Sequence, residues 1–195
     1  MQKHTSTQLF RYEVAGGVSE YHAMLRVTNP RLTFAEQIES LQAAYDHLVS
    51  NELPGAVAVL KRYFLSDAAN QANILLATQV EHSDCALSII EQPPLDGTKV
   101  ALWVYLQTGV QTRTLPHGDY EVSHGGYRHL WSAANFNKAS KSEYQTRLLL
   151  NDYVMRLAEQ GCSLADNCIR TWFFVQNVDV NYGGVVKARN EVFLT

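Results

Sequence analysis

The order of predicted elements occurs twice in this chain, and this repetition constrains the fold more than any other feature. In the first copy the succession of helix, strand and helix occupies residues 34–48, 56–67 and 68–79. In the second copy the same succession occupies residues 144–158, 168–179 and 181–193. A unit of this length is too long for a solenoid or propeller repeat. We therefore predict two domains of one fold in tandem.

The sequence of the first half predicts a mixture of strands and helices. Alternating side chains and turn residues predict strands over residues 10–14, 21–27, 57–65, 87–91 and 99–106. After the second of these, Thr33 and Glu36 match a capping box that begins a helix. The predicted order is strand, strand, helix, strand, helix, strand, strand. This order favours an α+β fold in which helices cover one face of a mixed sheet.

The pattern restarts after a polar junction that glycine and proline interrupt. We expect a first domain over residues 1–107, a junction over 108–126 and a second domain that begins at 120 and runs to 195. The predicted elements of the second domain begin with a hairpin over residues 120–133. Ser142 and Gln145 match a second capping box, and Gly161 favours the end of the helix that follows.

The second copy has no counterpart of the strands predicted within residues 87–106. A sheet without its last strands exposes an unpaired edge, which another chain or further sequence would have to cover. We therefore expect this chain to be the N-terminal piece of a longer protein.

Composition excludes several classes of function. The net charge of -3 and the absence of a basic cluster argue against binding to nucleic acid or to a membrane surface. The N-terminus lacks the apolar region of a signal peptide, and no run approaches the length of a membrane span. Cys85, Cys162 and Cys168 contain no CxxC pair, so we expect reduced thiols and a cytoplasmic protein.

Residues 167–193, NCIRTWFFVQNVDVNYGGVVKARNEVF, resemble the strand, polar break and helix of the Rid/YjgF family, also labelled endoribonuclease L-PSP-like. Residues 56–106 resemble the family more loosely, and together the resemblance covers most of residues 8–195. Two such units in tandem are also similar to chorismatases. The resemblance implies a chorismate-mutase-like fold, a trimeric or pseudo-trimeric assembly, and ligand clefts between neighbouring units.

In active members of this family an arginine near the penultimate strand binds a substrate carboxylate, and water is directed at an imine carbon. Here the segment similar to that region is residues 83–88, and Cys85 stands near the position of the arginine. The family's glutamates are also replaced, near Ala101 and Trp103. The resemblance therefore implies a first copy without the usual chemistry. Cys85 lacks an assignable base and is more typical of a buried apolar residue than of a nucleophile.

Three residues are the candidate substrate-binding groups: Arg128, Trp131 and Arg170. In a fold of this family the early strands line the cleft between subunits, so an arginine there could meet an anion. The alternative interpretation is a solvent-facing arginine whose aliphatic stem packs along an aromatic ring.

Other polar features are given structural interpretations. His124 and His129 are too few to hold zinc, so we expect no metal site, and we expect no cofactor. The pair at 61–62 is predicted to lie on a solvated face, and the glycine pair at 183–184 to form a turn that starts a helix.

Two hypotheses of function follow. The first is a Rid-like module that shapes the core and the ligand cleft of a longer, homo-oligomeric protein acting on a small carboxylate metabolite, without itself performing chemistry. The alternative is an enamine or imine deaminase, or a chorismatase-like hydrolase, with its active site between subunits.

Overall fold

The computed structural model describes residues 4–79 and 85–194. The chain forms two compact units, Met1–Ala134 and Asn135–Thr195, which are described one at a time. The first unit combines helices with a mixed sheet, which confirms the predicted α+β class. The division between the units follows the hairpin of residues 120–131, whereas the predicted junction, 108–126, includes the first strand of that hairpin. The described residues of the second unit contain helices and no strand, so the predicted repetition of helix, strand and helix is not found there.

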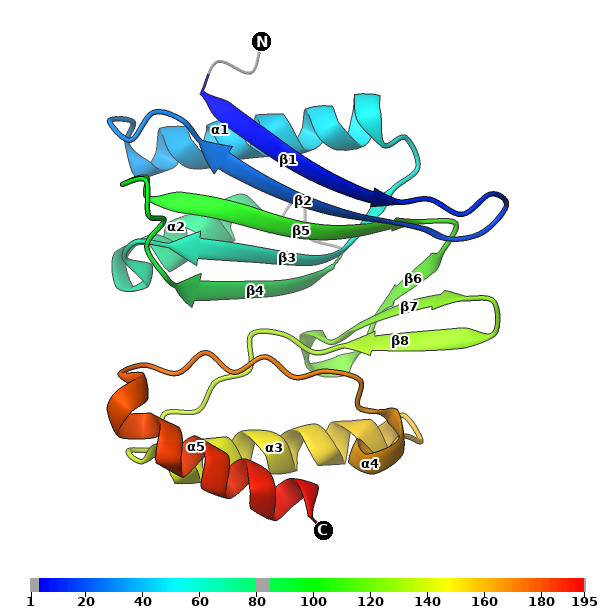
Figure 1. Cartoon of the computed structure of the whole chain (residues 1–195), viewed down its shortest axis with the longest axis vertical. Helices are drawn as coiled ribbons and strands as arrows, with labels where there is room; N and C mark the ends of the chain where they lie inside the picture. The colour runs from blue at the N-terminus through cyan, green and yellow to red at the C-terminus, as the bar shows by residue number, and fades with distance from the viewer. Residues whose placement is uncertain (1–3, 80–84, 195) are drawn as a thin grey trace. The chain divides into compact units, whose positions relative to one another are not determined.

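The first unit is built on a five-stranded sheet with the order β1-β2-β5-β3-β4 (Figure 1). Its strands are β1 Thr5–Tyr12, β2 Ser19–Val27, β3 Val57–Leu65, β4 Ala86–Glu91 and β5 Val100–Thr108. The β3–β4 pair is parallel and the other pairs are antiparallel. All five predicted strands are present, although β1 lies several residues nearer the N-terminus than predicted.

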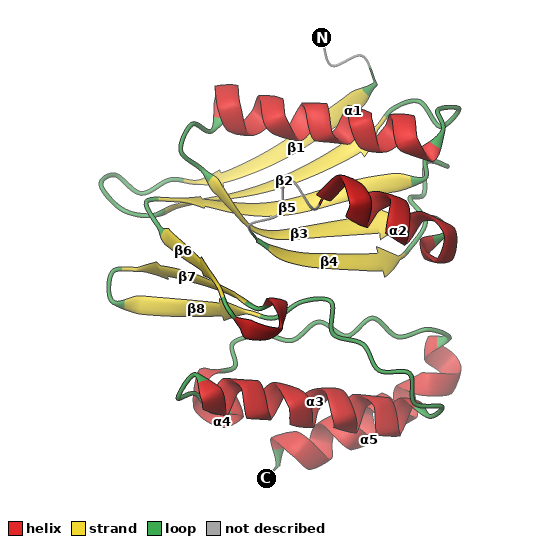
Figure 2. Cartoon of the chain, turned by 180° about the vertical axis from the view of Figure 1, so that it is seen from behind, coloured by secondary structure: helices red, strands yellow, loops and turns green. Residues whose placement is uncertain are grey.

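Two helices cover one face of this sheet (Figure 2). They are α1, Phe34–His47, which continues into a π-helical turn over Leu48–Glu52, and α2, Ala68–Gln79. The predicted capping box is confirmed: the Thr33 hydroxyl accepts from the Glu36 amide at 3.4 Å, and Glu36 accepts from the Thr33 amide at 2.7 Å. The core between the helices and the sheet includes Leu25, Leu41, Leu65, Leu75, Leu102 and Leu106.

A small antiparallel sheet packs on the face opposite the helices. Its strands are β6 Gln111–Thr114, β7 Tyr120–His124 and β8 Tyr127–Trp131. A second apolar cluster joins the two sheets and includes Val59, Leu60, Tyr105, Tyr120, Val122 and Trp131. The hairpin therefore belongs to the first unit, and its β8 strand brings side chains to the large sheet.

The second unit is helical in the residues that the structure describes. It contains α3 Ser142–Glu159, α4 Leu164–Asn167 and α5 Val178–Phe193, and α5 confirms the predicted last helix. A small core from α3 and α5 contains Leu150, Leu157, Val185 and Ala188. The strand predicted over residues 168–175 is wrong. The segment has the residue composition of a strand. No described residue of the second unit forms a strand, however, so the segment has no neighbouring strand with which to form hydrogen bonds.

The ends of α3 differ in part from the prediction. Gly161 has a φ of 71°, which confirms the left-handed end of the helix. The second capping box is wrong: Lys141 occupies the N-cap, and the Gln145 side chain instead donates to the carbonyl of Ala139. Over the described residues, none of the helices combines the length and the apolar character that crossing a bilayer requires.

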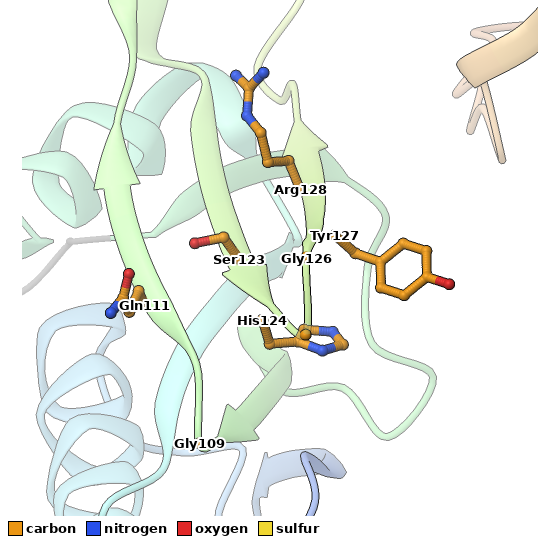
Figure 3. Close-up of a pocket in the computed structure, with 8 residues that line it drawn as sticks. Gly109, Gln111, Ser123, His124, Gly126, Tyr127 and Arg128 are labelled. Atoms are coloured by element: carbon orange, nitrogen blue, oxygen red, sulfur yellow. The ribbon is translucent and has the colours of Figure 1, made fainter.

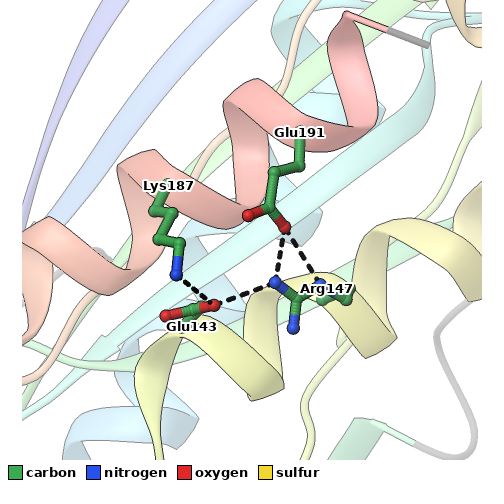
Figure 4. Close-up of polar contacts among 4 residues, drawn as sticks. All are labelled: Glu143, Arg147, Lys187 and Glu191. Atoms are coloured by element: carbon green, nitrogen blue, oxygen red, sulfur yellow. Dashed lines mark hydrogen bonds and ion pairs between the residues drawn. The ribbon is translucent and has the colours of Figure 1, made fainter.

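Gly183 and Gly184 lie inside α5, so the predicted helix-start turn is wrong. At Gly184 the helix comes so close to the start of α3 that an added Cβ would lie 2.7 Å from the Glu143 amide nitrogen. Beside this contact, Arg147 bridges Glu143 at 2.9 Å and Glu191 through a 3.2 Å hydrogen bond, and Lys187 pairs with Glu143 at 3.0 Å (Figure 4). Close packing and ion pairs thus fix α5 on α3.

Candidate functional site

The structure places the predicted ligand-binding residues in two different settings. Arg128 and Trp131 lie on β8 of the first unit, whereas Arg170 belongs to the second unit. The Arg128 guanidinium bonds to Glu121, with its Nε at 2.8 Å and its Nη2 at 2.7 Å from the same carboxylate oxygen. The Arg170 guanidinium lies 5.5 Å over the Trp172 ring. A role for any of them in binding stays a prediction.

Glu121 accepts hydrogen bonds from two arginines of the small sheet. It is 7% exposed, and Arg113 on β6 also donates to it at 3.0 Å. Burial by itself raises the pKa of Glu121, but the hydrogen bonds and charges of Arg128 and Arg113 outweigh burial and hold the pKa below its ordinary value of 4.5. The Glu121 carboxylate therefore forms an ion pair with Arg128, and this pair joins the two strands of the hairpin.

Replacing Glu121 with Gln should lower the free energy of unfolding by about 1–3 kcal/mol, because charged hydrogen bonds to both arginines are lost and the two cations repel. Since the folded pKa is the lower one, the wild-type advantage should be present above pH 4.5 and shrink as pH falls below that value. Urea unfolding at pH 7 and at pH 3 measures both effects. Glu13→Gln is the control, because its pair with Arg11 at 3.6 Å is exposed. Equal losses in the two variants would contradict this role for Glu121.

A shallow hollow of about 470 Å³ opens at the tip of the hairpin (Figure 3). Its lining includes Gln111, Ser123, His124, Tyr127 and Arg128 together with three glycines. Figure 3 shows the Arg128 and His124 side chains pointing in different directions. Because Arg128 is held by Glu121, the hollow brings few groups together for chemistry. A richer arrangement lies on the large sheet.

Planar side chains stack in a line on the sheet face opposite the helices. The guanidinium of Arg62 lies 5.2 Å over the ring of Trp103. Trp103 and His22 are nearly parallel with ring centres 5.8 Å apart, and His22 stacks on Tyr105 at 4.7 Å. The Tyr105 ring in turn contacts Trp131 of β8 at 5.5 Å. Trp131 is thus the one predicted residue that joins this line.

Strand register explains why these residues meet. Trp103 on β5 lies between Arg62 on β3 and Met24 on β2, and Tyr105 lies between Leu60 and His22. Residues two apart on a strand point to the same face, and directly paired residues of neighbouring strands share a face. The sheet therefore gathers a cation and several rings from three strands that are distant in sequence.

Arg62 forms the cationic end of the line. It is 7% exposed, and its Nε donates to the hydroxyl of Ser88 on β4 at 3.2 Å. Burial lowers the pKa of Arg62, but an arginine keeps its charge in proteins at neutral pH. The predicted solvated face at 61–62 is wrong, since both residues are buried. β3 is an inner strand, so its successive side chains enter opposite, enclosed faces of the sheet.

Glu20, Tyr105 and Gln107 form the acidic end. The Tyr105 hydroxyl accepts from the side-chain amide of Gln107 at 2.9 Å, and the carboxylate of Glu20 is near enough to raise the pKa of the phenol. Burial, followed by Glu20, raises the pKa of Tyr105, so the phenol stays protonated at neutral pH. Burial lowers the pKa of His22 and of His129, so both imidazoles are neutral at pH 7.

The segment that resembles the family's arginine region is only partly described. Ser83 and Asp84 lie outside the described residues, and Cys85 is half-buried immediately before β4. Trp103 carries the centre of the stack. The rings of His124 and His129 form a T-shaped contact with centroids 5.1 Å apart, and no group of three metal-ligating side chains occurs among the described residues.

Sequence reasoning missed most of the stack. The alternation on β2 puts Glu20, His22 and Met24 on one face, and that on β5 puts Trp103, Tyr105 and Gln107 on one face. Two strands with a polar and aromatic face, rather than an apolar one, are the signal that could have indicated this site.

Known proteins offer no match from which a function could be transferred. Neither family models nor curated proteins nor solved structures match this chain. The function is therefore inferred from the residues on the sheet face.

Proposed function

We propose that the first unit binds a small, planar, carboxylate-bearing metabolite on the sheet face opposite the helices. In this proposal the chain is a Rid/YjgF-like module with a chorismate-mutase-like fold that forms a ligand cleft rather than performing the family reaction. The observation that carries the proposal is the Arg62 guanidinium, which lies over Trp103 in line with His22.

The chemistry of this arrangement suits a flat anion. A guanidinium recognises a carboxylate through two parallel hydrogen bonds, and an enclosed site strengthens that interaction relative to water. The Ser88 hydroxyl beside Arg62 offers one more polar contact. The faces of Trp103 and His22 already meet their neighbours in the line, so a planar ligand would contact the edges of these rings. In the family that the chain resembles, an arginine near the position of Cys85 binds the carboxylate. In this proposal Arg62 on the neighbouring strand β3 provides that cation instead.

The alternative function is hydrolysis of an enamine or imine. The observation in its favour is the acidic end, where a carboxylate, a phenol and the neutral imidazole of His129 could move a proton. An amino-acid oxidase that generates imines, with ammonia release followed over time, tests it. Acceleration by the wild-type chain that Glu20→Gln abolishes would favour this alternative, and no acceleration would reject it.

Arg62→Met should weaken binding of benzoate, as a probe of the site, by at least about tenfold, which corresponds to about 1.4 kcal/mol. Isothermal titration calorimetry measures the affinity. Arg26→Met is the matched control, because Arg26 is exposed on the same sheet face, and it should change the affinity by less than about twofold.

Because Arg62 is buried, its variants require a check of folding. Arg62→Lys keeps the charge but loses the planar fork, so we expect an affinity between those of wild type and Arg62→Met. Thermal unfolding by circular dichroism shows whether each variant is folded at the temperature of the titration. Folded variants that bind benzoate as tightly as wild type would refute the proposal. The trimeric or pseudo-trimeric assembly that the family resemblance implies is a separate proposal, which light scattering tests.

A further inference from the structure

We infer that the ligand of this site carries a protonated amine at the end of its ring system opposite the carboxylate, and that Glu20 binds this amine. The inference rests on the proposed function for the carboxylate end, and it names the ligand class more closely: an aromatic or otherwise planar amino acid whose two charges are far apart.

The register sets the separation of the two ends. Arg62 pairs through Trp103 with Met24, and Glu20 lies four residues before Met24 on β2. With the usual rise along strands and the usual spacing between them, the Cα atoms of Arg62 and Glu20 are about 16 Å apart. Both side chains are long, so their charged ends can approach each other across the stack. A ligand with charges at opposite ends of one ring fits this interval better than an α-amino acid, whose charges are adjacent.

The charges around Glu20 favour a cation at neutral pH. The groups around it include Tyr12, its direct partner on β1, Tyr105 and Gln107 of β5, and the imidazoles of His22 and His129, which are neutral at pH 7. Glu20 is half-buried, so a ligand can reach it. Its carboxylate therefore gives this end a net negative charge, opposite in sign to the Arg62 end.

Gln107 provides an independent indication of a missing hydrogen-bond donor. Its side chain is fully buried, its amide nitrogen donates to Tyr105, and within the described parts of the chain no donor reaches its Oε1. A buried acceptor without a donor costs about 1–3 kcal/mol. Gln107 lies directly opposite Glu20 in the strand register, so an ammonium group bound at Glu20 could also donate to this oxygen.

Three probes separate this inference from the proposed function. 4-(Aminomethyl)benzoate carries both charges. 4-Ethylbenzoate has nearly the same shape and keeps the carboxylate, but a methyl group replaces the ammonium group. Benzylamine keeps the ammonium group and lacks the carboxylate. Calorimetric titrations of wild type should show a preference for the amine over its isostere of about tenfold. Glu20→Gln should reduce that preference to about twofold or less, while Glu39→Gln, on the exposed side of α1, should preserve it.

Arg62→Met should weaken both benzoates by a similar factor and leave benzylamine binding unchanged. A wild type that binds the two benzoates equally, or a Glu20→Gln variant that retains the preference, would overturn the inference while the carboxylate site stands. Benzylamine binding that depends on Glu20, with no effect of Arg62→Met on either benzoate, would refute the proposed function alone. Binding of none of the three probes at millimolar concentration would overturn both.

Discussion

Gly184→Ala should lower the free energy of unfolding of the second unit by about 3 kcal/mol, at the upper end of the usual cost of overpacking. The new Cβ would lie 2.7 Å from the Glu143 amide nitrogen and 3.3 Å from its Cα, and closer still to the hydroxyl of Ser142. The first two are backbone atoms at the start of α3. They cannot rotate away, so the two helices would have to separate.

Gly183→Ala is the matched control, because an added Cβ there meets no atom within 4 Å. Both glycines are inside α5, where alanine is favoured over glycine by roughly 1 kcal/mol, so this variant should be slightly more stable than wild type. The two substitutions thus change composition identically and should change stability in opposite directions.

Urea unfolding followed by fluorescence and circular dichroism measures both variants. The two units can unfold in separate transitions, so the transition of the helical unit is the one to compare. Ser142→Gly in the Gly184→Ala background should recover only part of the loss, since the contact with the Glu143 backbone remains. Equal stabilities of Gly183→Ala and Gly184→Ala would show that α5 does not approach α3 this closely.

The elements of residues 5–108 follow from local signals in the sequence. The capping box of Thr33 and Glu36 satisfies backbone donors within one turn of helix, so it depends on no distant contact. The alternation on β2 requires only that one face of the strand be buried. Signals of this kind are complete within a few residues, which is why the order of strands and helices could be predicted.

The errors occur where a structure depends on distant partners. The β-branched and aromatic residues of 168–175 have the composition of a strand, but a strand forms only when a neighbouring strand accepts its hydrogen bonds. Gly184 was interpreted as a helix-start turn because the approach of α3 is invisible in the sequence. Sequence composition therefore gave the propensity of these segments but not their contacts.

The same reason explains the candidate site. The place of Arg128 on an early strand predicts a ligand-binding role, but the register of the hairpin places it beside Glu121. The sequence predicts a solvated face for the basic pair at 61–62, whereas the order of strands encloses β3. The stack of Arg62 on Trp103 depends on the pairing of β3 with β5, which a single sequence does not reveal.

Lys61→Met should raise the free energy of unfolding of the first unit by about 1–3 kcal/mol at pH 7, because a methionine of similar shape has no charge to desolvate. Lys61 is fully buried on the helix side of the sheet, and its Nζ lies 4.1 Å over the Tyr45 ring. The cation–π contact is one of the contacts that recover part of the desolvation cost, but burial outweighs the neighbouring charges and lowers the pKa of Lys61. Lys138→Met, at an exposed lysine, should change stability by less than about 0.5 kcal/mol.

The pH dependence separates charge from packing. Burial lowers the pKa of Lys61 from its ordinary value of 10.5, against the opposing influence of Cys85 and Asp46. Between the folded and the unfolded pKa the unfolded chain binds more protons, so wild-type stability should rise with pH in that window, and the advantage of Lys61→Met should shrink as pH approaches 10.5. Urea titrations of both proteins at pH 7 and pH 10 measure this difference. Methionine that destabilises at both pH values would mean that the contacts of the ammonium outweigh its desolvation, and Lys61 would then be a structural anchor between the sheet and α1.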